Sequence, residues 1–222
     1  HDRIEGFMEA MTMPLPAEPP SVGELTPGSV IRGTLEARDA GMKIVDVRIT
    51  GHEQLAPLGT SADPKPGDLM PAVVLPATGG ELTVGAGQGV PTVLTFLFTS
   101  CPVDNYCPLL SRKLAELQPL IADRARIVAV TLDPDNDSLE VLAEYGERYA
   151  ADPAVWKFAR LEEDGLDALL RQVGGMRAVS PETITHNLRL VAMDAEGTVL
   201  GLYPDNKWDP EVVAALFEAP DP

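Results

Sequence analysis

Two almost continuously apolar runs constrain the fold of this chain more than any other feature. Residues 90–99 (VPTVLTFLFT) and 125–132 (ARIVAVTL) have the length of single strands, and such runs are typical of strands covered on both faces. Between them, apolar residues recur at helical spacing, at Leu110, Leu114, Leu117 and Ile121. Pro119 is expected to bend or split the end of this helix. The pattern predicts an α/β sheet built around the two runs.

The second half of the chain continues the alternation of strands and helices. Asp137-Ser-Leu-Glu140 is a capping box, which predicts a helix that reaches Tyr149. The other expected elements are a helix at 166–173, a hairpin of strands 188–193 and 198–203, and a terminal helix that begins at Asp209-Pro210 and reaches Phe217. This order predicts a mixed α/β sheet with flanking helices and an antiparallel edge.

The first 51 residues have a different pattern, which is typical of β structure. Residues 29–38 (SVIRGTLEAR) alternate between apolar and polar positions, and residues 45–50 alternate in the same way after a turn at 39–41. Three strands at most cannot bury a core. We therefore interpret residues 1–51 as part of a small, OB-like β-barrel.

A segment rich in Pro, Gly and small polar residues separates these two patterns. It covers residues 52–67 and predicts a linker. The expected organisation is a partial barrel at 1–51, the linker, and an α/β domain at 68–222.

The charge of the chain limits its binding partners. The 222 residues carry a net charge of −17, whereas nucleic acids and anionic membranes are bound through a surplus of Lys and Arg. No apolar run approaches the ~18 residues of a membrane helix. Because the first residue is His1 rather than Met, we expect an upstream segment, and membrane contact is expected only through an anchor there.

The only two cysteines of the chain predict a functional site. Cys101 lies where the first apolar run ends, and Cys107 lies where the helix containing Leu110 begins. A helix start has free backbone N–H groups and a positive dipole end, which favour a thiolate over a thiol. On this pattern alone, a structural disulfide, a metal-free dithiol and a metal site all stay open.

Three strings within residues 68–218 carry a resemblance to a known family. They are Phe98-Thr-Ser-Cys-Pro102, Thr131-Leu-Asp-Pro-Asp-Asn-Asp137 and Thr185-His186. Together they resemble the Sco/SenC family of thioredoxin-fold copper proteins, which serve cytochrome c oxidase assembly. The resemblance implies a thioredoxin-like fold and a copper site formed by the sulfurs of Cys101 and Cys107 and an imidazole nitrogen of His186.

The chemistry of these side chains agrees with copper. Soft thiolates suit Cu(I), and imidazole suits both copper states. A Cys2His set can also hold zinc, but no base for zinc catalysis is suggested nearby. The chain departs from the family in having five residues between its cysteines, where the usual number is three. Asp104 and Asp133 resemble acidic positions near the family site, and Asp133 reads equally well as a turn residue.

A methionine cluster near the start of the chain is the second informative feature. Met11 and Met13 share one face of a predicted strand. The segment from His1 to Met13 resembles the copper-binding signature of small CusF-type periplasmic barrels, which implies that His1, Met11 and Met13 hold Cu(I). Met8 stands where the family has an aromatic residue and is an alternative fourth ligand. The competing interpretation is that these methionines pack in a core.

Together these features predict a periplasmic or extracytoplasmic copper metallochaperone rather than an enzyme. It would bind Cu(I) or Cu(II), depend on an external thiol reductant, and deliver copper to an apo acceptor such as the copper centre of cytochrome c oxidase. The alternative is a metal-independent thiol–disulfide oxidoreductase with Cys101 and Cys107 as its catalytic residues. A copper sensor or buffer is a third, weaker interpretation.

Overall fold

The computed structural model describes residues 29–38, 41–52, 63–179 and 184–218. The chain divides into two compact units, one within residues 1–59 and one that spans residues 60–180 and 184–222. The division falls inside the segment predicted as a linker, most of which lies outside the described residues.

The described part of the first unit is a β-hairpin. Strand β1 (Ser29–Arg38) pairs antiparallel with strand β2 (Gly41–His52), as the alternation predicts. The pairing is irregular at two points. Asp46 and Val47 lie opposite the single residue Gly33, where Asp46 has a φ of 53°, and Thr50 is an extra residue between the partners of Val30 and Ile31. Because of the extra residue opposite Gly33, Arg48 shares a face with Val45, and Ile49 lies on the opposite face and is 49% exposed. The regular alternation predicted for residues 45–50 is therefore wrong beyond Val47.

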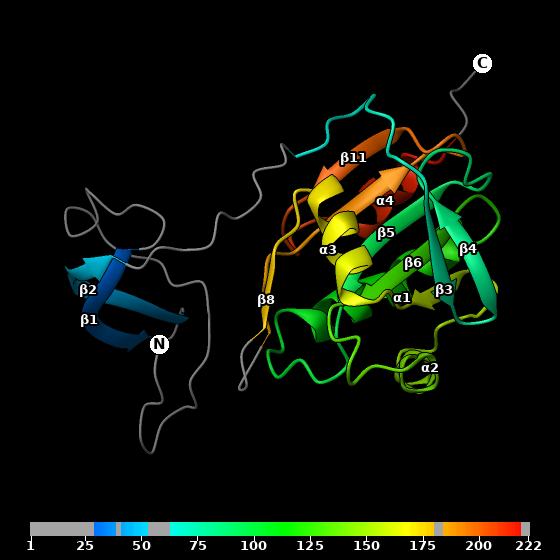
Figure 1. The fold of residues 1–222 in the computed structure, drawn as a ribbon. Helices are drawn as coiled ribbons and strands as arrows, with labels where there is room; N and C mark the ends of the chain where they lie inside the picture. The colour runs from blue at the N-terminus through cyan, green and yellow to red at the C-terminus, as the bar shows by residue number, and fades with distance from the viewer. Residues whose placement is uncertain (1–28, 39–40, 53–62, 180–183, 219–222) are drawn as a thin grey trace. The chain divides into compact units, whose positions relative to one another are not determined.

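A seven-stranded mixed sheet forms the centre of the second unit (Figure 1). In sheet order, its strands are β11 (Val199–Tyr203), β10 (Leu190–Met193), β5 (Thr92–Leu97), β6 (Arg126–Thr131), β7 (Trp156–Ala159), β3 (Val73–Ala77) and β4 (Gly80–Val84). Strands β5, β6 and β7 are parallel, and antiparallel pairing begins on either side of them. All of β5 and all of β6 except its first residue are buried, as expected for strands covered on both faces.

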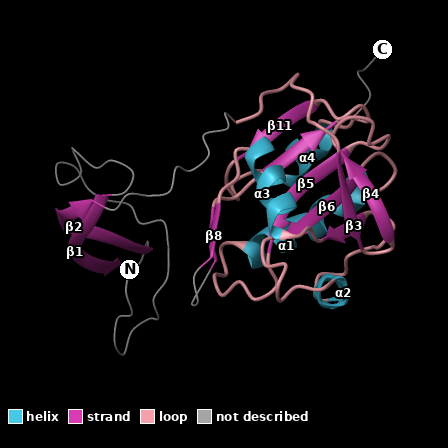
Figure 2. Cartoon of the chain, in the orientation of Figure 1, coloured by secondary structure: helices cyan, strands magenta, loops and turns pink. Residues whose placement is uncertain are grey.

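Helices pack around this sheet, and α3 lies in front of it in the view of Figure 2. The described helices are α1 (Cys107–Ile121), α2 (Leu139–Glu147), α3 (Glu163–Gln172) and α4 (Pro210–Ala215). Helix α1 buries the four apolar residues that predicted it. It runs unbroken through Pro119, so the helix tolerates the missing backbone N–H two residues before its end.

The ends of three helices differ from the predicted ones. Helix α3 spans Glu163–Gln172 rather than 166–173. The N-cap of α2 is Ser138, whose Oγ accepts a hydrogen bond from the Val141 N–H at 3.3 Å, and the helix ends at Glu147 rather than Tyr149. The predicted capping box is therefore wrong: with Ser138 as the N-cap, Val141 rather than Glu140 stands three residues later, because the Asp137 side chain is used elsewhere. The terminal helix begins as predicted, with the Asp209 carboxylate accepting from the Glu211 N–H at 2.8 Å, but it ends at Ala215.

The mixed α/β sheet with flanking helices is confirmed, and several short strands were not predicted. The hairpin β3–β4 and strand β7 extend the sheet beyond β6. A separate two-stranded sheet pairs β8 (Arg177–Val179) with β9 (Ile184–His186). This small sheet carries the predicted histidine ligand.

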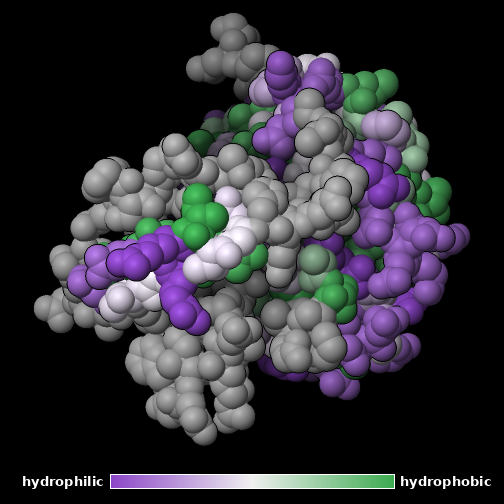
Figure 3. All heavy atoms as spheres, turned by 60° about the vertical axis from the view of Figure 1, so that its left-hand side comes forward, coloured by the Kyte–Doolittle hydropathy of each residue, from purple (hydrophilic) through white to green (hydrophobic). Residues whose placement is uncertain are grey.

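The visible surface of the second unit is mostly hydrophilic (Figure 3), in keeping with the net charge of −17. Among the described residues, no helix has both the length and the apolar composition needed to cross a membrane.

Candidate metal centre

The two cysteines lie at the junction of β5 and α1. Cys101 lies in the loop after β5 and is partly exposed, whereas Cys107 is the first residue of α1 and is fully buried. Both thiols are free, and their side chains are hydrogen-bonded to each other. The structure therefore brings the two predicted sulfur ligands together as a dithiol.

The two thiols differ strongly in acidity. The hydrogen bond from the Cys107 side chain lowers the pKa of Cys101 to about 6, and backbone hydrogen bonds from Val103 and Cys107 act in the same direction against the effect of burial. The pKa of Cys107 is raised well above its usual value, because its thiol donates that hydrogen bond and is buried beside the Cys101 charge. At neutral pH, Cys101 is therefore a thiolate and Cys107 a thiol.

His186 is the last residue of β9 and lies beside the loop that carries the cysteines. Its ring meets the rings of Phe98 and Tyr106 edge-on, with centroid distances of 5.7 and 6.1 Å. Its Nδ1 lies 2.9 Å from the Asn187 carbonyl oxygen, and when Nδ1–H donates to this oxygen, Nε2 keeps its lone pair. Burial lowers the pKa of His186, so its imidazole is neutral at pH 7.

Two neighbours hold the strand that carries His186. Arg177 lies opposite His186 in the β8–β9 ladder, and its Nε donates to the Leu132 carbonyl at 2.5 Å while its guanidinium pairs with Glu163 at 3.3 Å. Asn187 accepts from the Met176 N–H at 2.8 Å and donates to the Gly174 carbonyl at 3.0 Å. The position of His186 is thus set by side chains outside the predicted ligand set.

Sequence reasoning missed a buried acid beneath the site. The Asp137 carboxylate is 1% exposed and accepts hydrogen bonds from the Thr99 N–H at 3.1 Å, the Thr99 hydroxyl at 2.5 Å and the Thr131 hydroxyl at 2.6 Å. It therefore ties the end of β6 to the residue two positions before Cys101. The signal was the string Thr131–Asp137, which carried the family resemblance, but the side chain of Asp137 was assigned only to a helix cap.

The two acidic residues that the resemblance suggested have other surroundings. Asp104 is exposed, and its backbone carbonyl accepts the Leu109 N–H at 3.1 Å. The Asp133 carboxylate accepts from the Asn136 side chain at 3.0 and 3.1 Å, and the Asp133 carbonyl accepts the N–H groups of Asn136 and Asp137. These bonds support the turn interpretation of Asp133.

The predicted ligands are gathered only in part. The two cysteine side chains are hydrogen-bonded to each other, and the His186 ring contacts Tyr106, the residue that precedes Cys107. Among the residues that the structure describes, no three His, Cys, Asp or Glu side chains are grouped closely enough to hold a metal ion. His1, Met8, Met11 and Met13 lie outside the described residues, so the second predicted site stays a prediction.

Comparison with protein families decides what kind of domain carries this dithiol. Residues 73–219 match the SCO1/SenC family model. The chain belongs to the SCO1/SenC family. The match begins at β3 and ends after α4, so the SCO1/SenC domain is the second unit. A search of curated protein sequences found no match.

Solved structures share this fold. A SCO1/SenC family lipoprotein from Bacillus anthracis is 19% identical, with a TM-score of 0.60, and the alignment covers 70% of this chain and 97% of that protein. Yeast Sco1, solved with copper bound, is 21% identical, with a TM-score of 0.53 and coverages of 67% and 85%. BsSco, described as a member of the Sco family of cytochrome c oxidase assembly proteins with a disulfide switch, is 19% identical, with a TM-score of 0.56 and coverages of 69% and 94%.

These likenesses confirm the thioredoxin-like Sco fold predicted for this SCO1/SenC chain. The CusF-like segment at 1–51 lies outside the residues matched by the SCO1/SenC model.

Proposed function

We propose that this chain is a copper metallochaperone that holds copper through Cys101, Cys107 and His186. The observation that carries the proposal is the free, hydrogen-bonded dithiol of a SCO1/SenC domain, with one sulfur ionised at neutral pH and a neutral imidazole beside it. Two thiolates and one imidazole suit Cu(I) and also accommodate Cu(II). Yeast Sco1, which shares the fold, was solved with copper bound.

Each ligand enters the site in a different protonation state. The Cys101 thiolate is ready to bind near pH 7, and His186 offers a neutral nitrogen. Cys107 must lose its proton when the metal binds, because its pKa is raised. One proton is therefore released for each copper bound near pH 7, and copper binding stabilises the buried Cys107 thiolate.

Binding by all three residues also requires His186 to approach the sulfur pair. The β8–β9 sheet that carries His186 is separate from the central sheet (Figure 1). A shift of this hairpin toward the cysteine loop would therefore break no strand pairing of the central sheet.

Delivery of the metal defines the partners that we propose. BsSco is described as a member of a cytochrome c oxidase assembly family, and the copper centre of that oxidase is the acceptor we propose for this chain. Both cysteines must be reduced to take up copper, so an external thiol reductant is part of the cycle. One relative is described as a lipoprotein, and we propose an extracytoplasmic location with an anchor upstream of His1.

In this proposal, residues 1–51 supply a second copper site. His1, Met11 and Met13, with Met8 as an alternative ligand, would collect Cu(I) through an imidazole and thioethers. Transfer from there to Cys101 and Cys107 is favourable, because a thiolate is a stronger donor for Cu(I) than a thioether.

Cys101→Ser tests the copper assignment. The purified full chain, loaded with Cu(I) without oxygen and freed of excess metal, should hold one copper fewer when Cys101 is replaced. Ser138→Ala, which changes the exposed N-cap residue of α2, is the control and should keep the parent copper content. Equal copper in the parent and in Cys101→Ser would exclude these cysteines as copper ligands.

A thiol–disulfide oxidoreductase is the second candidate, and the asymmetry of the dithiol favours it. The partly exposed Cys101 thiolate could attack an acceptor disulfide, and the Cys107 thiol, after losing its proton, would then displace the acceptor and form the Cys101–Cys107 disulfide. The pair loses two electrons and the one proton of Cys107, and the acceptor disulfide takes up those electrons and two protons, one from Cys107 and one from solvent, to become two thiols. Loading with Cu(II) separates the candidates, because a copper thiolate absorbs strongly in the visible range and a metal-free reductase does not.

A further inference from the structure

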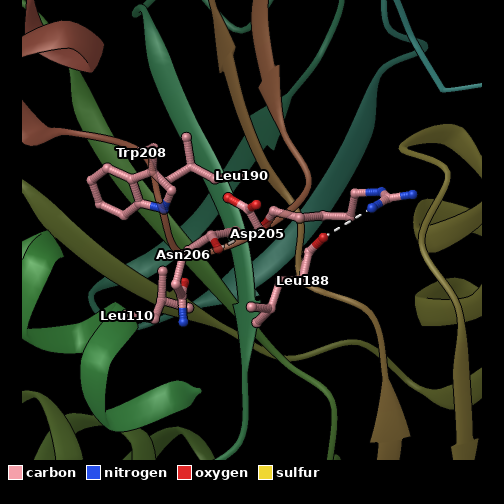
Figure 4. A pocket seen from close by; sticks show the side chains of 8 residues that line it. Leu110, Leu188, Leu190, Asp205, Asn206 and Trp208 are labelled. Atoms are coloured by element: carbon pink, nitrogen blue, oxygen red, sulfur yellow. Dashed lines mark hydrogen bonds between the residues drawn. The ribbon is translucent and has the colours of Figure 1, made fainter. Parts of the chain in front are cut away.

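The loop between β11 and α4 reaches the cysteine loop through one side chain, that of Asn206. Its Nδ2 donates hydrogen bonds to the carbonyl oxygens of Asn105 and Tyr106, at 3.0 and 3.1 Å. Figure 4 shows Asn206 pointing toward helix α1 beside Leu110. The hollow lined by Asn206, Leu110 and Trp208 is too narrow to hold a water molecule.

The loop that presents Asn206 is itself firmly held. The Lys113 ammonium, on α1, donates to the Asn206 carbonyl at 2.8 Å and also to the Trp208 carbonyl. The same ammonium lies 5.1 Å from the centre of the Trp208 ring, and Trp208 is 5% exposed. Asp209 then caps α4. Because its backbone is fixed by α1 and by the start of α4, the Asn206 amide is preorganised toward the cysteine loop.

The cysteine loop, by contrast, is held mainly by backbone hydrogen bonds, among them those from the Leu109 N–H to the Asp104 carbonyl at 3.1 Å and from the Leu110 N–H to the Tyr106 carbonyl at 2.8 Å. Tyr106 is the N-cap residue of α1, and its side chain makes no capping hydrogen bond. The Tyr106 N–H donates to the Val103 carbonyl at 2.9 Å, and Arg112 makes a long bond of 3.4 Å to the Asp104 carbonyl. Five residues separate the cysteines, and a longer loop has more conformations to lose. The two bonds from Asn206 restrain the peptides immediately before Cys107.

We propose that Asn206 is a positioning residue for the dithiol. By holding the carbonyls of residues 105 and 106, it keeps the Cys107 sulfur next to Cys101 and keeps the Tyr106 ring against His186. Its effect on the dithiol stands without copper, and its effect on the metal site rests on the proposed function.

The dithiol–disulfide equilibrium of the metal-free full chain tests this role. Glutathione disulfide takes two electrons from the cysteine pair and yields two glutathione thiols, while the pair forms one disulfide, so the ratio of products to reactants gives an equilibrium constant. That constant depends on how closely the two sulfurs are held. Asn206→Ala should lower it at least about tenfold.

Two further variants separate positioning from folding. Asn206→Asp keeps the size of the side chain but places acceptor oxygens against two carbonyls, so the constant should fall at least as far as in Asn206→Ala. Lys207→Ala changes the exposed neighbour of Asn206 and should leave the constant unchanged. If Asn206→Asp keeps the parent constant, or if Lys207→Ala lowers it equally, the proposal is wrong. A variant with an unchanged melting temperature and a lowered constant supports it.

Copper adds an independent readout. In the Cu(II)-loaded chain, Asn206→Ala should shift the thiolate-to-copper absorption band, whereas Lys207→Ala should not. If the parent binds no copper, the proposed function fails, and the glutathione equilibrium still decides the role of Asn206.

Discussion

The Cys101 sulfur owes its acidity mainly to one donor, the Cys107 thiol. Below a pH of about 6, Cys101 is protonated and weakly nucleophilic, and above it the thiolate predominates. We therefore expect the rate of Cys101 alkylation by iodoacetamide, followed by mass spectrometry from pH 4.5 to 9.5, to rise with a midpoint near 6.

A pair of substitutions tests the cause of that acidity. Cys107→Ala removes the donor, so the midpoint should rise toward the ordinary value of a cysteine, ~8.5. Cys107→Ser keeps an O–H that can donate, and its midpoint should stay below that of Cys107→Ala. Equal midpoints in the parent and in Cys107→Ala would show that the pKa of Cys101 has another origin.

The local sequence pattern was sufficient to predict the long helices and strands but not the short strands. The buried runs of β5 and β6 and the apolar stripe of α1 have the length at which periodicity identifies an element. Strand β7 has four residues and β8 and β9 have three each, which is too few to show a hydrophobic period. Strand β3 was missed for another reason, because Pro76 inside it argues against a strand.

The residues of the site likewise divide into those that local sequence pattern predicted and those that it did not. Two cysteines at a strand end and a helix start predict their meeting from local pattern alone. The place of His186 depends on β8–β9, on Arg177 and on Asn187, which are brought there by the fold. Only the family resemblance predicted that the histidine belongs with the cysteines. Nothing local marked Asn206, because its partners lie about 100 residues earlier.

The β8–β9 hairpin provides a test at the scale of an element. Arg177→Ala removes its bond to the Leu132 carbonyl and its pairing with Glu163, so His186 is less well placed. Residues that orient a metal ligand typically change affinity about 10–100-fold. We expect Cu(I) affinity, measured by competition with a coloured chelator without oxygen, to fall about tenfold and no further than in His186→Ala.

Arg160→Ala is the matched control for that test. Arg160 also donates its Nε to a carbonyl that follows β6, that of Pro134, at 2.8 Å, and pairs with a glutamate, Glu162. It does not belong to the hairpin that carries His186. If Arg160→Ala weakens copper binding as much as Arg177→Ala, the effect comes from general destabilisation rather than from the placement of His186.

At the scale of the whole molecule, the SCO1/SenC domain accounts for residues 73–219, and the segment before it has a separate pattern. The partial barrel predicted for residues 1–51 stays a prediction, because the described residues of that segment form a single hairpin. Two soft-ligand sets on one chain nevertheless predict a definite order of filling. Thiolates bind Cu(I) more strongly than thioethers, so the first copper should go to the cysteines and the second to the methionines.

Met11→Leu combined with Met13→Leu tests this order in the full chain. The double variant should bind one Cu(I) per chain where the parent binds two, because leucine keeps the apolar volume but has no sulfur. One equivalent of Cu(I) should protect Cys101 from alkylation equally in both proteins, since the first copper does not need the methionines. Met70→Leu, at a buried methionine of the second unit, should keep both coppers.

If the parent binds a single copper, the thioether site is absent. If Cys101 stays reactive until the second equivalent of Cu(I) is added, the thioether site is the stronger of the two. If the thioether site is absent, no copper can pass from residues 1–51 to the dithiol, and if it is the stronger site, that transfer would run against the affinities.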